Sequence, residues 1–382
     1  MPLKDLKSLR FLGWPLLCGA LIGVLIVQSQ KQPQPTPSAA ATTPSATIVD
    51  APYSYADAVD RAAPAVVNIY TAKTVQVAVN PLLSDPLMQR FFRSRSPQQE
   101  RVQRSLGSGV IVDTQGYVLT NAHVIRDADQ ILVALHDGRE ALANVVGSDP
   151  ETDLAVLKID LGELPPIPLG STRNARVGDV VLAIGNPYGF GQSVSQGIIS
   201  ATGRYGLQLA TYESYIQTDA AINPGNSGGA LIDARGELIG INTAIFSQSG
   251  GSSGIGLAIP TEIAVRTMKD LIEFGHPVRG WLGIEVTRAP ADVIAANDQA
   301  PGNGIVITQI TQGGPAQRAG LAKGDLIIAI NDQAVGDGHA GMNIIGTTRP
   351  GDKVSIVAIR EGKRETFAVT VGTRPAVEEA QR

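Results

Sequence analysis

The stretch NPGNSGGALI, residues 223–232, places one serine among glycines and follows it with an apolar run. Ser227 fits the G-x-S-x-G pattern, in which a serine can act as a nucleophile. The pattern alone is weak, because the chain has 42 glycines and short glycine patterns recur by chance. The bare Gly-Ser-Gly at 107–109 is more typical of a turn. The run after Ser227 has the character of a strand, whereas an α/β-hydrolase would continue into a helix.

Composition limits the class of protein. The chain has 382 residues, enough for two or three domains of ~150 residues each. A net charge of −4 gives no indication of nucleic-acid binding. The single cysteine, Cys18, excludes an intrachain disulfide, and with four histidines no zinc-site spacing exists. We therefore expect neither a metal nor another cofactor.

The N-terminal region is expected to anchor the chain in a membrane. Residues 1–10 are basic, and an apolar run over 11–28 would span ~25 Å as a helix, near the lower limit for crossing a bilayer. The alternative is a cleaved signal peptide, but small residues at the A-x-A positions do not follow the run. The positive charge predicts a cytoplasmic N-terminus, an inner-membrane anchor and a body in a compartment like the periplasm. Residues 29–50 are a Pro/Ser/Thr/Ala-rich linker.

The body is predicted to be mostly β. Short apolar runs with turn residues between them indicate antiparallel sheets closed into barrels, with no helix before residue 261. The expected strands cover 65–70, 109–112, 117–120, 130–134, 141–146, 154–159, 179–184, 193–200, 215–217, 230–232, 238–244 and 256–259. The 28 residues over 78–105 form a basic and partly apolar insertion, which is either a disordered loop or a regulatory or subunit contact.

A helix is predicted over 261–274, with Thr261 as a possible cap and Gly275 at its end. Its expected buried face consists of Ala264, Met268, Leu271 and Ile272. A second β-rich module follows over 276–375, and the tail over 376–382 is polar. Within that module a short helix is expected over 316–321, between strands at 304–310 and 325–331.

Three residues form the candidate catalytic set. A serine nucleophile needs a base, and the base needs an orienting carboxylate. His123 follows the strand-like GYVLT, and Asp153 stands at the entry to an apolar strand, with Asp149 as a competing acid in a Ser-Asp-Pro turn. The order His123, Asp153, Ser227 is that of chymotrypsin-like β-barrel enzymes. Backbone N–H groups of Gly225 and Ser227 are the expected donors to the oxyanion.

These motifs resemble those of the HtrA family of serine proteases over about residues 55–372. The resemblance rests on GSGVIV, GYVLTNAHVI, TDLAVLKI, AIGNPYGF, IQTDAAINPGNSGGALI and GIGLAIP, and on RGWLGIEV and GPAQRAGLAKGDLIIAIN. It implies a chymotrypsin-like double β-barrel protease domain over 51–275 and one PDZ domain over 276–375. With an N-terminal anchor, the chain is similar to the membrane-anchored DegS/AlgW type. The family also implies a homotrimer and the oxyanion assignment to Gly225 and Ser227.

The resemblance also assigns specificity and control. Ala221, six residues before the serine, would form the base of the specificity pocket and select a small apolar residue. Trp281, Leu282, Gly283 and Ile284 resemble the loop that holds the carboxylate of a bound peptide. Arg279 matches a position that relays peptide binding to the protease loops. In the expected sensing loop over 201–214, Arg204 is the sole basic residue, and Tyr212, Glu213 and Ser214 occupy the stretch where DegS-type proteins have an arginine.

The function expected from these features is a regulated periplasmic endopeptidase of the envelope stress response. C-terminal peptides of misfolded outer-membrane proteins would activate it through the PDZ domain, and a transmembrane anti-sigma factor would be its substrate. One alternative is a general periplasmic quality-control protease, which the anchor and the single PDZ domain disfavour. The other is a PDZ-based peptide-binding or chaperone protein with little proteolytic activity, which a complete catalytic set disfavours.

Overall fold

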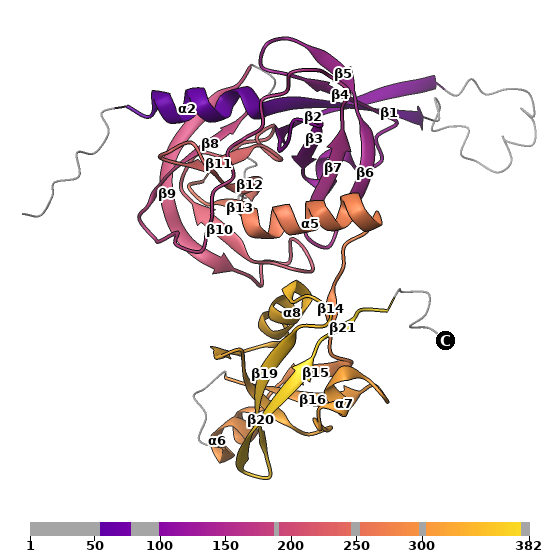
Figure 1. The fold of residues 1–382 in the computed structure, drawn as a ribbon, viewed down its shortest axis with the longest axis vertical. Coiled ribbons are helices and arrows are strands. Elements are labelled where there is room, and N and C mark those ends of the chain that lie inside the picture. Colours follow the sequence, from indigo (N-terminus) through magenta and orange to yellow (C-terminus); the bar gives the residue numbers. More distant parts are fainter. Residues whose placement is uncertain (1–53, 78–98, 187–190, 246–252, 298–302, 376–382) are drawn as a thin grey trace, which may run out of the picture. The chain divides into compact units, whose positions relative to one another are not determined.

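The computed structural model describes residues 54–77, 99–186, 191–245, 253–297 and 303–375 (Figure 1). The predicted anchor over 11–28, the linker over 29–50 and the tail over 376–382 lie outside the described residues. Among the residues that are described, no helix is long and apolar enough to cross a membrane.

The first half of the body is a seven-stranded sheet. After α2 (Ala56–Ala62) and the 3-10 turn η1 (Ala63–Ala65), its hydrogen-bonded order is β5-β4-β1-β2-β3-β7-β6. The strands are β1 (Val66–Val77), β2 (Gln99–Ile111), β3 (Tyr117–Thr120), β4 (Gln130–Ala134), β5 (Glu140–Leu142), β6 (Asn144–Asp149) and β7 (Leu154–Lys158). The order is open between β5 and β6, whereas the predicted double barrel implied closure.

The second half is a closed six-stranded barrel in the order β10-β13-β12-β11-β8-β9. Its strands are β8 (Val180–Gly185), β9 (Ser193–Arg204), β10 (Tyr215–Thr218), β11 (Ala230–Asp233), β12 (Leu238–Ile245) and β13 (Gly256–Pro260). One apolar cluster joins the two halves, since it includes Ile69 and Leu157 of the first and Ile184 and Ile232 of the second. This shared core fixes the segments that carry the site.

The strands β1 and β2 are longer than the sequence predicted. They pair from Val66 opposite Val110 out to Val77 opposite Gln99, so residues 99–105 belong to a strand and not to the insertion. The prediction failed there because the extensions are polar and lack a continuous apolar run. The rest of the insertion, residues 78–98, lies outside the described residues. The prediction of no helix before residue 261 was also wrong, because α2 and the one-turn α4 (Ala122–Ile125) are helical.

Helix α5 (Thr261–Phe274) contacts β6 and β7 of the first half and β12 and β13 of the second (Figure 1). The bounds agree with the prediction, and Gly275 ends the helix with a φ of +74°. Two details differ. Thr261 does not cap the helix, because its hydroxyl donates to the Leu238 carbonyl at 2.8 Å. Ile272 is 37% exposed, although it was expected on the buried face.

The C-terminal module is a second β unit with its own core. Its main sheet has the order β15-β16-β17-β19-β20, with β15 at the edge, and β14 pairs with β21. The strands are β14 (Gly280–Trp281), β15 (Ile284–Arg288), β16 (Ile305–Ile310), β17 (Leu326–Ile330), β18 (Gln333–Ala334), β19 (Lys353–Arg360), β20 (Lys363–Thr370) and β21 (Gly372–Thr373). The helices are α6 (Ala291–Ala296), α7 (Pro315–Arg318) and α8 (Gly338–Thr347), and α7 is shorter than the predicted 316–321.

Candidate active site and peptide groove

His123 and Asp153 come together because neighbouring strands deliver them. His123 lies in α4 directly after β3, and Asp153 directly precedes β7, which pairs with β3. Nδ1 of His123 is 2.7 Å from Oδ2 of Asp153, and the His123 backbone N–H donates to Oδ1 at 3.0 Å. Asp153 adopts a φ of +58°, a conformation that Asp tolerates better than most residues. The two contacts fix both the position and the ring orientation of the histidine.

The third partner of Asp153 comes from the other half of the body. Thr243 of β12 donates from Oγ1 to Oδ2 of Asp153 at 2.7 Å. Burial alone would raise the pKa of Asp153, but hydrogen bonds from His123 and Thr243 and the charge of His123 outweigh it, and the pKa lies below its ordinary value of 3.8. Asp153 is therefore an ionised carboxylate that can orient His123 and stabilise its protonated form.

Asp149, the competing acid, belongs to a different network. It is buried, accepts a hydrogen bond from Thr152 at 2.5 Å and forms an ion pair with Arg279. The structure thus brings His123 together with Asp153 and not with Asp149.

Ser227 lies in the turn between β10 and β11, on the second half of the body. Its Oγ donates to the Thr243 carbonyl at 3.0 Å, and no hydrogen bond joins it to His123, although the structure describes both residues. Thr243 is thus the common neighbour of the serine and the acid. A Cβ at position 228 would collide with the Ser108 carbonyl and the Thr120 hydroxyl, so Gly228 is required for the close approach of the two halves.

The residues before Ser227 form a tight glycine turn. Gly225 has a φ of +104°, in the region that favours glycine. The N–H groups of Gly225 and Ser227 donate no hydrogen bond to any described residue, so both remain available to an external acceptor. Ala221 is exposed on the same segment, and its carbonyl accepts a hydrogen bond from Ser195 at 2.7 Å.

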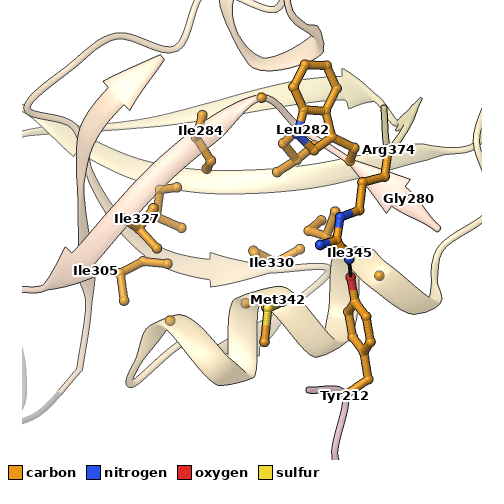
Figure 2. A pocket seen from close by; sticks show the side chains of 16 residues that line it. Tyr212, Gly280, Leu282, Ile284, Ile305, Ile327, Ile330, Met342, Ile345 and Arg374 are labelled. Carbon is orange, nitrogen blue, oxygen red and sulfur yellow. Dashed lines mark hydrogen bonds between the residues drawn. The ribbon is translucent and has the colours of Figure 1, made fainter. Parts of the chain in front are cut away.

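The C-terminal module contains an apolar cavity of about 290 Å³ (Figure 2). All four predicted loop residues, Trp281, Leu282, Gly283 and Ile284, line it. Its apolar wall also includes Val286, Ile305, Ile327, Ile330, Met342 and Ile345, and Tyr212 and Arg374 lie at the same cavity. The N–H groups of Leu282 and Gly283 donate to no described residue. The cavity therefore combines an apolar wall, free backbone donors and the edge strand β15, which are the features that bind a peptide C-terminus by strand addition.

Arg279 and Tyr212 connect the segment before β14 to the loop over 201–214. The Arg279 guanidinium lies 4.7 Å from the centre of the Tyr212 ring. Arg374 donates to the Tyr212 hydroxyl at 3.2 Å, the hydrogen bond drawn in Figure 2. The pKa of Tyr212 is raised, and burial of the side chain is the main cause, so this hydroxyl stays protonated at neutral pH. Arg204 takes no part in these contacts; it donates to Gln217 at 2.9 Å within the barrel.

The sequence did not point to several of these residues. Arg374 and Glu151, which pair at 2.8 Å, stand outside the motifs, and Thr243 lies in the motif GINTAI but was given no role. Glu213 organises the loop over 201–214, because its carboxylate accepts from the N–H groups of Leu207 and Leu209, both at 2.6 Å. Glu213 is buried in the structure, but the sequence gives no signal of that burial.

Comparisons with known proteins agree with this geometry. Residues 107–241 match the trypsin-like peptidase domain and residues 280–371 match the PDZ domain, which together define a trypsin-like serine endopeptidase with one peptide-binding module. Serine endoprotease DegS of Salmonella typhimurium is 46% identical over 86% of this chain and 88% of its own length. The chain belongs to the HtrA family of serine proteases.

Two further relatives are informative. The solved structure of the HtrA-type protease AlgW with an S227A substitution and a decapeptide is 55% identical, covers 85% of this chain and 98% of its own, and superposes with a TM-score of 0.70. A protein of Pseudomonas putida named a probable periplasmic serine endoprotease DegP-like is 42% identical over 83% of this chain and 69% of its own length. Both DegS-type and DegP-type proteins are thus close to this sequence.

Proposed function

We propose that His123, Asp153 and Ser227 are the catalytic triad of this endopeptidase. The observation that carries the proposal is the hydrogen-bonded series from His123 through Asp153 to Thr243 and Ser227. Catalysis requires the Ser227 hydroxyl to turn from the Thr243 carbonyl to Nε2 of His123. Apo structures often show such catalytic contacts incompletely formed.

The chemistry then follows from the geometry. Oγ of Ser227 attacks the carbonyl carbon of the scissile peptide bond and passes its proton to His123. The carbonyl oxygen becomes an anion, which the N–H groups of Gly225 and Ser227 stabilise. His123 gives the proton to the leaving amine. A water molecule, activated by His123, then attacks the acyl-enzyme and releases the second product and Ser227. Asp153 stays ionised throughout. Ala221 at the pocket base favours substrates with a small apolar residue before the cleaved bond.

The PDZ domain is proposed as the control element. A peptide with a free apolar C-terminus adds to β15, places its last side chain in the cavity and its carboxylate against the loop Trp281–Ile284. The proposed ligands are C-terminal peptides of misfolded outer-membrane proteins. Arg279 relays their binding to the protease, with Arg204 as a second regulatory candidate. The decapeptide named in the AlgW structure supports peptide binding in this family.

The biological setting is proposed from the DegS-type relatives. The chain would be a single-pass inner-membrane protein that assembles as a homotrimer, with the protease and PDZ domains in the periplasm. It would cleave a transmembrane anti-sigma factor as part of the envelope stress response. The DegP-like relative supports a second candidate, a general periplasmic quality-control protease.

One assay separates these candidates. Residues 51–382 are incubated with casein and with a candidate anti-sigma domain, with and without peptides that end in a free apolar carboxylate. Peptide-dependent cleavage of the anti-sigma domain alone supports the regulated protease, and amidated peptides should then lose most of the effect. Peptide-independent digestion of casein would favour quality control. Peptide binding without cleavage of either substrate would favour a PDZ-based binding protein.

A further inference from the structure

Ser108, from the Gly-Ser-Gly whose sequence was typical of a turn, is fully buried in β2 next to the active site. Its backbone is fixed at both ends: its N–H donates to the Ser227 carbonyl at 2.8 Å, and its carbonyl accepts from the Thr120 hydroxyl at 2.7 Å. Its side chain makes two further bonds. Oγ donates to the Gly225 carbonyl at 2.7 Å and accepts from the Asn186 N–H at 3.0 Å.

The Ser108 hydroxyl restrains the backbone of Gly225. Gly225 has a φ of +104°. Because glycine has no side chain, no steric barrier keeps its backbone in this conformation. The turn closes on itself through the Asn226 N–H, which donates to the Asn223 carbonyl at 3.0 Å. Among the residues that the structure describes, Ser108 is the one outside the turn that donates a hydrogen bond to the Gly225 carbonyl. The Gly225 carbonyl shares its peptide group with the Asn226 N–H, and the Gly225 and Ser227 N–H groups belong to the peptide groups on either side. A rotation of this central group would therefore shift both flanking N–H groups relative to the substrate.

We propose that Ser108 is a positioning residue of the oxyanion hole: its buried hydroxyl locks the Gly225 carbonyl and so keeps the Gly225 and Ser227 N–H groups directed at the substrate. The inference rests on the proposed roles of Gly225 and Ser227. Ser108 touches no reacting atom and acts through the turn alone. Because Asn186 donates to the same oxygen, the segment after β8 is tied to the turn as well.

The test replaces Ser108 by alanine in the full chain of 382 residues. Alanine keeps both backbone bonds and removes the hydroxyl alone. The probe is a fluorophosphonate, whose phosphorus bonds to Oγ of Ser227 as fluoride leaves and whose phosphoryl oxygen occupies the oxyanion position. Labelling rates are measured by mass spectrometry with and without a decapeptide that ends in a free phenylalanine carboxylate. The adduct is also compared by ³¹P NMR, which senses hydrogen bonds to the phosphoryl oxygen.

Thr261→Val is the matched control. It also removes a buried hydroxyl, one that donates to a backbone carbonyl at 2.8 Å, but at a place remote from the turn. Complete loss of one oxyanion donor lowers the rate about 10²–10³-fold, so N–H donors that are present but misdirected should lower it less. We expect Ser108→Ala to slow labelling by about tenfold to 100-fold and to move the ³¹P resonance. Thr261→Val should leave both close to the wild type.

Ser108→Cys provides a second variant if alanine prevents folding, because its S–H is a weak donor in a side chain of similar shape. It should also label more slowly than the wild type while remaining folded. The proposal is overturned if the folded variants label at the wild-type rate, or if Thr261→Val is slowed as much as Ser108→Ala with no change in the ³¹P resonance. A folded wild type that never labels would overturn the triad assignment itself, and this inference with it.

Discussion

Replacement of Arg279 by methionine should destabilise the protein strongly. The Arg279 and Asp149 side chains are 5% and 1% exposed, so their ion pair is shielded from water. Methionine would leave the Asp149 charge buried without a cationic partner, with the Thr152 hydroxyl and the Glu151 N–H as its remaining donors. Breaking a buried pair in this way costs ~3–5 kcal/mol. Loss of the contact between Arg279 and the Tyr212 ring adds ~0.5–2 kcal/mol.

The double variant Arg279→Met/Asp149→Leu separates the two contributions. It removes both charges together, so it should lose less stability than Arg279→Met alone, although the Thr152 hydroxyl loses its acceptor at ~1–3 kcal/mol. Urea unfolding followed by circular dichroism gives the free energies, and the double-mutant cycle gives the coupling between the side chains. The reasoning is refuted if Arg279→Met costs under ~1 kcal/mol, or if the double variant costs the sum of the single ones.

Three further outcomes are expected. Ser227→Ala should abolish cleavage of casein or the anti-sigma domain while leaving the melting temperature and peptide binding by calorimetry unchanged; cleavage at the wild-type rate would contradict the triad. Thr243→Val removes a hydrogen bond to a carboxylate, so it should raise the pKa of Asp153, measured by carbon NMR of the carboxyl, and lower stability by ~1.5–3 kcal/mol. Because the pKa of Asp153 lies below 3.8, its ionised form stabilises the fold above that pH, and this contribution is lost as the pH falls through the folded-state pKa. The difference in unfolding free energy between wild type and Asp153→Asn should therefore be constant near neutral pH and shrink below about pH 4; a difference that grows on acidification would contradict the sign.

The sequence predicted most of the strands well, because an apolar run is a local feature, whereas the triad of His123, Asp153 and Ser227 stays a prediction. A buried strand ends where its run of apolar and β-branched residues ends, and β3 and β4 have the predicted bounds. The polar ends of β1 and β2 were missed because their pairing with each other, and not an apolar run, makes them strands.

Contacts between distant segments could not be predicted in the same way. Thr243 reaches Asp153 across 90 positions, and Ser108 reaches Gly225 across 117. Neither residue type is unusual in its local context, so only the packing of the two halves shows their neighbours. The dismissal of Gly-Ser-Gly at 107–109 as a turn was wrong for this reason, since Ser108 lies within a strand.

The division of the site between two sheets has a consequence for the newly made chain. His123 and Asp153 belong to the first sheet, whereas Ser227 and Thr243 belong to the barrel that follows it. Roughly 70 residues separate the acid from the serine, so a ribosome needs about 4–15 s to deliver the serine after the acid, and longer to complete the second half. During that time the nascent chain has the proposed base and acid but not the proposed nucleophile. The protease should thus be unable to cut itself or its neighbours until both halves have been synthesised and docked.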